Sequence, residues 1–177
     1  MVGRYMISST KAITVLWGNE LPGHFLTVCY STMDTLGLLF SPPDQVSADR
    51  KSFKAWVDRF LIPRARDGYT SVDLYAARCA ILHSHSTASD LSRSGKARQV
   101  QYYFADRSDP KAKELIELTG RLHDGGHIAV HIQDFGTSLV EAMSDSVGEL
   151  ISTSNSCKRS AARLQEILQF YPLQDAP

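Results

Sequence analysis

The sequence has few of the residues that mark specialised small proteins. Only three of its 177 residues are cysteines, Cys29, Cys79 and Cys157, and no two of them form a C-x-x-C pair. This count excludes a disulfide framework and a zinc ribbon, and it is typical of a protein whose thiols stay reduced. A run of about 18 apolar residues is also lacking, so we expect no membrane-spanning helix.

An excess of charge of one sign is lacking too. Nineteen basic residues stand against nineteen acidic ones, and the formal net charge is zero. A broad positive field of the kind that coats nucleic acid is therefore excluded, while a local basic patch is not. Near the N-terminus Lys11 interrupts the apolar residues, so we expect no secretion signal and a cytoplasmic protein.

Several sequence motifs of common enzymes are missing as well. The chain contains no Gly-rich phosphate loop, no nucleophile elbow and no H-E-x-x-H pattern. These absences leave kinase, NTPase, α/β-hydrolase and zincin activities without support, and they indicate no cofactor.

Apolar residues make up 43% of the chain, and their spacing predicts helices in the first half. Pro22 begins a buried helix over residues 22–40, and a second helix runs over about 47–61 with Ser47 as its cap. A third, almost uncharged helix runs from about residue 71 to 85. Together these helices form a bundle core over about residues 22–85.

The second half mixes helical and strand patterns. Residues 84–97 are polar and predict a loop, and alternation in the segments 99–104 and 127–132 predicts two short strands that pair. Helical patterns occupy residues 111–123, 134–152 and 157–170. We therefore predict a single domain, residues 1–177, that is mainly α, with a two-stranded β element (about 99–132) and additional C-terminal helices (about 134–170).

The third helix carries the sharpest chemical signal, Arg78 followed by His83 near its end. Arginine offers a permanent planar cation that can hold phosphate oxygens, and histidine can move protons near neutral pH. This pair suits RNA cleavage by internal attack of a 2′-hydroxyl. Around an ideal helix the two side chains point about 140° apart, so the spacing predicts that two copies share one site across a dimer.

The segment LYAARCAILHSHS around this pair resembles the motif helix of the HEPN superfamily. Its members are small helical bundles, usually dimeric, with arginine, four to six residues and then histidine near the end of one helix. Many are metal-independent ribonucleases of toxin–antitoxin, abortive-infection or CRISPR-associated systems, and others are inactive helical modules. The resemblance implies that Arg78 contacts phosphate and His83 transfers protons. Cys79 follows the arginine where active members commonly have a polar residue.

Asp34 is the carboxylate that the buried helix over residues 22–40 offers to this pair. A lone buried carboxylate is costly, so we expect Asp34 to have a cationic partner. It either neutralises Arg78 as a structural pair or orients Arg78 or His83 within a catalytic site. The first role fits a non-catalytic module that binds a protein partner or RNA, and the second fits the endoribonuclease.

A basic cluster follows the motif and predicts where RNA binds. Arg93, Lys96 and Arg98 lie close in sequence to Tyr102, and cations beside aromatic rings suit single-stranded RNA. His85, two residues beyond the motif, is a further candidate donor. We predict these five residues as substrate-binding and expect a homodimer, an RNA substrate and an antitoxin or other protein partner.

A second histidine group comprises His123, His127 and His131. Their spacing would line one face of a helix and could bind a transition metal, but Gly125 and Gly126 interrupt any such helix. If the segment is a strand, His127 and His131 share a face without a third ligand. A metal-dependent enzyme built on these histidines is the weakest of the three hypotheses, and we predict no metal site.

Overall fold

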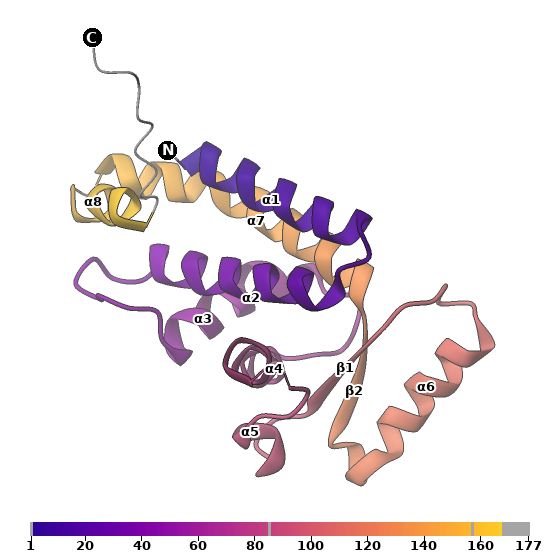
Figure 1. Cartoon of the computed structure of the whole chain (residues 1–177). Coiled ribbons are helices and arrows are strands. Elements are labelled where there is room, and N and C mark those ends of the chain that lie inside the picture. Colours follow the sequence, from indigo (N-terminus) through magenta and orange to yellow (C-terminus); the bar gives the residue numbers. More distant parts are fainter. Residues whose placement is uncertain (1, 85, 157, 168–177) are drawn as a thin grey trace.

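The computed structural model describes residues 2–84, 86–156 and 158–167, and helices dominate this part of the chain (Figure 1). The helices are α1 (Val2–Gly18), α2 (Pro22–Leu39), α3 (Arg50–Trp56), α4 (Ser71–Ser84), α5 (Asp90–Arg93), α6 (Pro110–Arg121), α7 (Ile132–Ser156) and α8 (Lys158–Ile167). The strands are β1 (Gln99–Tyr103) and β2 (His127–His131). A mainly helical fold with a small two-stranded sheet, as predicted, is confirmed. No helix in the described ranges has both the length and the apolar character that crossing a membrane requires.

Helix α2 forms the centre of the bundle. It contacts α1 and α7 on one side and α3 and α4 on the other, so it is covered on most of its faces (Figure 1). Its buried side chains accordingly form a broad face of the helix and include Phe25, Cys29, Tyr30, Met33 and Leu36. The predicted buried helix over residues 22–40 is confirmed.

The crossing of α2 and α3 is close enough to require glycine. A Cβ atom on Gly37 would lie 2.9 Å from the carbonyl carbon of Ser52 and 3.0 Å from the Cα atom of Phe53. Both are backbone atoms, which cannot turn aside as a side chain can. The absence of a side chain at residue 37 therefore sets the distance between the two helices.

Helix α3 begins later than the sequence predicted. Its cap is Asp49 rather than Ser47, because Asp49 and Ser52 cap each other: the Ser52 amide donates to the Asp49 side chain at 2.7 Å, and the Asp49 amide donates to the Ser52 hydroxyl at 2.9 Å. Beyond the helix the chain continues through a π-helical turn (Val57–Leu61) and a 3₁₀ turn (Ile62–Arg64).

The two strands pair in parallel, with residues 99–103 opposite residues 127–131. Parallel neighbours need a crossover connection, and α6 supplies it. Figure 1 shows α6 beside this sheet, away from the bundle. The predicted pairing of the two segments is confirmed.

Two helices were not predicted. Helix α1 packs on α2 and α7 and buries Met6, Ser9 and Ile13. The short helix α5 interrupts the predicted loop over residues 84–97, where Ser89 and Ser92 cap each other as Asp49 and Ser52 do.

Helix α8 is attached to the end of α2 by one guanidinium group. Arg163 is buried, and it donates hydrogen bonds of 2.7 to 3.1 Å to the carbonyl oxygens of Leu38, Ser41, Pro42 and Gln45. These oxygens belong to the last turn of α2 and the following loop, where the helix dipole favours a cation. Helices α7 and α8 confirm the predicted C-terminal helices, while residues 157 and 168–170 of that prediction lie outside the described residues.

Candidate functional site

Helices α2 and α4 pack together and bring Asp34, Arg78 and His83 into contact. Arg78 donates a hydrogen bond from Nε to Oδ2 of Asp34 at 2.8 Å, and its Nη2 lies 2.6 Å from the same oxygen in an ion pair. Its third nitrogen, Nη1, lies 2.9 Å from Nε2 of His83. The three residues predicted as catalytic thus form one connected set, which we call the Asp34–Arg78–His83 set.

The orientation of the helices explains this contact. Arg78 is in the middle of α4, at the interface with α2, and His83 is the penultimate residue of α4. The prediction that the two side chains diverge on one helix considered only their directions, which differ by about 140°. It neglected the length of the arginine side chain, which reaches along the helix to His83. The contact therefore forms within one copy, and the argument that convergence needs two copies is wrong.

The set lies at the surface of the bundle. The side chains of Asp34 and Arg78 keep 16% and 20% of their surface exposed, and His83 is exposed. Burial alone lowers the pKa of the Arg78 guanidinium, but the hydrogen bonds and charge of Asp34 outweigh it and raise the pKa above its ordinary value. The arginine is therefore held charged and fixed, at a place that a ligand can reach.

The contact between Arg78 and His83 also assigns the donor and the acceptor. Arginine has only donors, so Nε2 of His83 accepts in this contact and its ring proton sits on Nδ1. A ring with an unprotonated Nε2 can take a proton from a hydroxyl once Arg78 turns to another partner.

Tyr75, Arg50 and Cys79 surround the set and were not among the predicted site residues. The guanidinium carbons of Arg50 and Arg78 lie 5.7 and 6.0 Å from the centre of the Tyr75 ring. Burial, followed by the neighbouring Cys79, raises the pKa of Tyr75. Tyr75 precedes Arg78 by three residues, a helical spacing that could have revealed it, whereas no sequence signal links Arg50 to α4.

Two of the residues predicted to bind RNA have structural partners instead. The Arg98 guanidinium donates to Asp73 at 2.6 and 3.1 Å, because Asp73 is almost fully buried and needs a counter-charge. The Tyr102 hydroxyl is hydrogen-bonded to that of Tyr30, and its ring lies 5.7 Å from the ring of Phe135. Arg98 and Tyr102 thus stabilise the fold, and their contact with RNA stays a prediction.

The other predicted RNA-binding residues lie elsewhere. Arg93 and Lys96 are exposed and line a cleft beside α4, away from the Asp34–Arg78–His83 set. The predicted site residue His85 lies outside the described residues.

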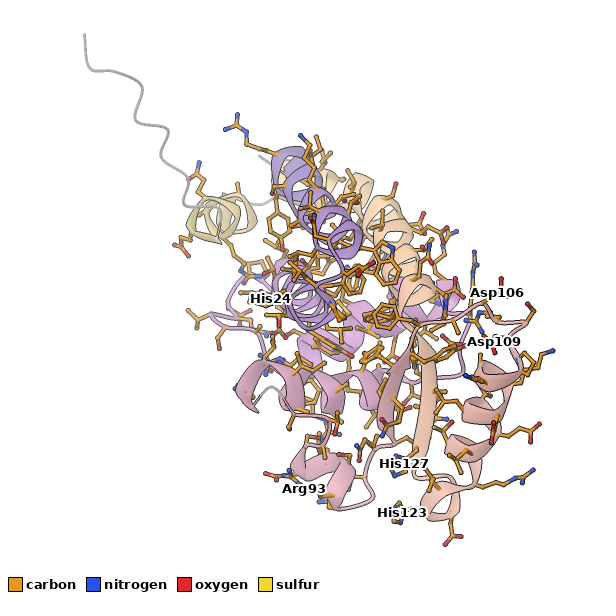
Figure 2. All side chains as sticks on the ribbon, turned by 45° about the vertical axis from the view of Figure 1, so that its right-hand side comes forward. His24, Arg93, Asp106, Asp109, His123 and His127 are labelled. Atoms are coloured by element: carbon orange, nitrogen blue, oxygen red, sulfur yellow. The ribbon has the colours of Figure 1, made fainter. Side chains whose placement is uncertain are left out.

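The second histidine group does not converge. The rings of His123 and His127 stack with their centres 5.2 Å apart, near the lower edge of the molecule in Figure 2. His131 is turned elsewhere, with Nε2 bound to the carbonyl oxygen of Ala105 at 2.9 Å. Within the described part of the chain no three histidine, cysteine or carboxylate side chains come together as metal ligands.

Comparison with known proteins found no match for the chain: no family model, no curated protein and no solved structure matches it. Its chemistry must therefore be argued from the side chains themselves: a fixed cation beside a neutral imidazole, both open to solvent, is equipped to bind a phosphate and to accept a proton.

Proposed function

We propose that the protein is a metal-independent endoribonuclease with a HEPN-like bundle, acting through the Asp34–Arg78–His83 set. The observation that supports this most strongly is that the two edges of the Arg78 guanidinium have different partners. Asp34 engages Nε and Nη2, which leaves Nη1 facing His83 and solvent. A phosphate that approaches Nη1 can replace the histidine as its partner.

The reaction that this geometry suits is internal transesterification. His83 Nε2 takes the proton of a 2′-hydroxyl, and the resulting oxygen attacks the adjacent phosphorus atom. The bond from phosphorus to the 5′-oxygen of the next nucleotide breaks, that oxygen takes a proton from water, and His83 returns its own proton to the solvent. The products are a 2′,3′-cyclic phosphate and a 5′-hydroxyl. Arg78 stabilises the extra negative charge on the phosphate oxygens during the attack.

Asp34 acts in this scheme as a positioning residue. It does not reach the substrate itself but holds one edge of the guanidinium, so that the other edge points outward. We propose that two copies then place their sets at one shared site, since all three side chains reach the surface of the bundle. An antitoxin or other protein partner would regulate activity by covering this surface.

The test is cleavage of a labelled single-stranded RNA in EDTA. The wild type should produce 2′,3′-cyclic phosphate ends, and both His83→Ala and Arg78→Gln should lower the rate by about 100-fold or more. His24→Ala is the matched control, because His24 is an exposed histidine on α2. Folded wild type that is inert on diverse RNAs, or His83→Ala with full activity, would refute the proposal.

Mixing the two inactive variants tests the shared site. If two copies share it, mixed dimers of Arg78→Gln and His83→Ala contain one intact arginine and one intact histidine, and activity should partly return. If each copy acts alone, the mixture stays inactive, and sedimentation will show whether the protein is a dimer at all.

A second function is favoured by the Asp34–Arg78 pair itself. A largely buried arginine held by a hydrogen bond and an ion pair to one carboxylate is what a non-catalytic module, binding a protein or RNA, would contain. In that case the same variants change stability or partner binding and cleavage is absent from all of them.

A further inference from the structure

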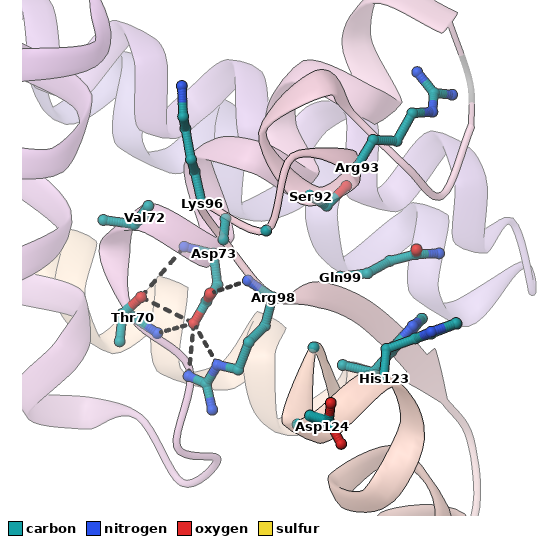
Figure 3. A pocket seen from close by; sticks show the side chains of 15 residues that line it. Thr70, Val72, Asp73, Ser92, Arg93, Lys96, Arg98, Gln99, His123 and Asp124 are labelled. Carbon is teal, nitrogen blue, oxygen red and sulfur yellow. Dashed lines mark hydrogen bonds and ion pairs between the residues drawn. The ribbon is translucent and has the colours of Figure 1, made fainter.

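A cleft of about 840 Å³ lies outside the Asp34–Arg78–His83 set, and Arg93 and Lys96 are among its lining residues. The N-terminal turn of α4, the loop that follows α5, and the turn before β2 form its walls (Figure 3). Three segments distant in sequence thus meet around one open space.

The base of the cleft is rigid. Asp73 accepts hydrogen bonds from the Arg98 amide at 2.8 Å and from the Thr70 amide and hydroxyl at 2.9 Å, in addition to those from the Arg98 guanidinium (Figure 3). Its side chain is only 4% exposed. Asp73 and Arg98 therefore neutralise each other, and their contacts hold α4 against the start of β1.

Arg93 and Lys96 supply the available positive charge. Arg93 has one ion pair, 3.3 Å to Asp90 on an exposed turn, where such pairs are weak. Lys96 is exposed and forms no ion pair with the described residues. Both cations can therefore turn toward a ligand in the cleft.

The opposite wall carries the stacked rings of His123 and His127. His127 is held by Gln101, whose amide nitrogen lies 3.2 Å from Nδ1. His123 and Asp124 have positive φ angles of 48° and 53°, a strained conformation for residues other than glycine. The chain thus accepts backbone strain at the point where it presents these rings.

We propose that this cleft binds an RNA strand, with Arg93 and Lys96 at its phosphates and the His123–His127 pair stacked on a base. Cations on one side and aromatic planes on the other are the elements of single-strand recognition. The inference rests on the proposed function, which makes RNA the ligand. Asp73 and His83 are ten residues apart on α4, about 15 Å along the helix, so the cleft holds a different part of the strand from the reacting phosphate.

Binding can be measured apart from cleavage by using a short fluorescent oligonucleotide whose 2′-hydroxyls are all methylated, which blocks internal attack. Anisotropy titrations over a range of salt concentrations should show that Lys96→Gln and Arg93→Gln each weaken binding about three- to tenfold. Each should also reduce the salt dependence by about 0.7 in logarithmic slope, the value for one phosphate contact on a single strand.

Two further variants probe the opposite wall. Asp124→Asn removes a carboxylate that repels phosphate, and asparagine tolerates the positive φ angle, so binding should tighten. His123→Asn removes a ring under the same backbone constraint and should weaken binding about fivefold. Lys11→Gln on α1, an exposed lysine outside the cleft, is the matched control and should bind as the wild type does.

The outcomes separate this inference from the proposed function. If no RNA is cleaved but the cleft variants shift binding as stated, the cleft binds RNA and the nuclease proposal fails. If RNA is cleaved but the cleft variants bind as the wild type does, the inference fails. Displacement of the oligonucleotide by an equal concentration of adenosine monophosphate would also overturn it, in favour of a free-nucleotide site.

Discussion

The guanidinium of Arg78 has two edges with different neighbours. One edge is bound by the Asp34 carboxylate, and the other faces the His83 ring. A change at Asp34 therefore acts on stability and on orientation together. It leaves a largely buried cation without its counter-charge. It also removes the contacts to Nε and Nη2 that hold the guanidinium with Nη1 toward His83.

For this reason we expect Asp34→Asn to lower the free energy of unfolding by about 2 kcal/mol, between the values typical of exposed and buried pairs. The same variant should lower the cleavage rate at saturating RNA more than it changes KM. Urea unfolding and initial rates measure the two effects. Asp90→Asn breaks the exposed pair with Arg93 and should leave unfolding unchanged. Equal stability of Asp34→Asn and the wild type would contradict this account of the pair.

The sequence revealed some of these residues for sound physical reasons. Asp34 and Arg78 each place a charge on an apolar helix, and such charges need partners, so their pairing could be anticipated. Arg98 and Tyr102 gave a signal for RNA binding, yet their partners, Asp73 and Tyr30, lie 25 and 72 residues away. Local sequence does not report such distant contacts.

At the scale of elements, α2 and α3 are in close backbone contact at Gly37. A methyl group at residue 37 would meet backbone atoms on α3. The helices would have to separate, and α2 carries Asp34 while α3 begins with Arg50, so the separation would also disturb the site.

We expect Gly37→Ala to destabilise the protein by about 1–3 kcal/mol, as overpacking usually does. Gly148→Ala on α7 is the matched control, because nothing lies within 4 Å of a Cβ atom there. It should be neutral or stabilising by up to about 1 kcal/mol, since alanine is the better helix former. Thermal unfolding of both variants decides the matter, and equal melting temperatures would show that the helices separate without cost.

The elements that the sequence predicted are those in which apolar residues recur with a clear helical or strand period. The apolar spacing in α2, α3 and α4 and the alternation in β1 and β2 were sufficient. Helix α1 was missed because its buried positions include Ser9 and its exposed ones include Ile7 and Val15, which blurs the pattern. Asp49 rather than Ser47 caps α3 because Ser52, three residues after Asp49, returns its hydrogen bond.

At the scale of the whole molecule, the zero net charge conceals ion pairs that join distant segments. Arg98 meets Asp73, and Arg107 meets both Asp67 and Asp134. Burial raises the pKa values of Asp73 and Asp134, but hydrogen bonds, those from Arg98 and Arg107 foremost, outweigh it, and both pKa values end below their ordinary value of 3.8.

The folded pKa values are thus lower than the unfolded ones, so these carboxylates contribute stability that is fully present above pH 3.8 and is lost as the pH falls through the folded values. We expect Asp73→Asn to be less stable than the wild type near about pH 6, with the difference shrinking toward about pH 3. Urea unfolding at several pH values measures this. Asp44→Asn, on an exposed loop, should follow the wild type throughout, and a difference for Asp73→Asn that grows on acidification would contradict the sign.

The position of helix α1 affects the order in which the helices can pack during synthesis. It packs on α2, its neighbour in the chain, and on α7, which begins at residue 132. During synthesis α2 is available almost at once, whereas α7 leaves the ribosome only after most of the chain has been made. Until then α1 keeps part of its apolar face uncovered, in the state in which nascent proteins aggregate or bind chaperones. Helix α1 is thus synthesised well before α7, the helix that completes its enclosure.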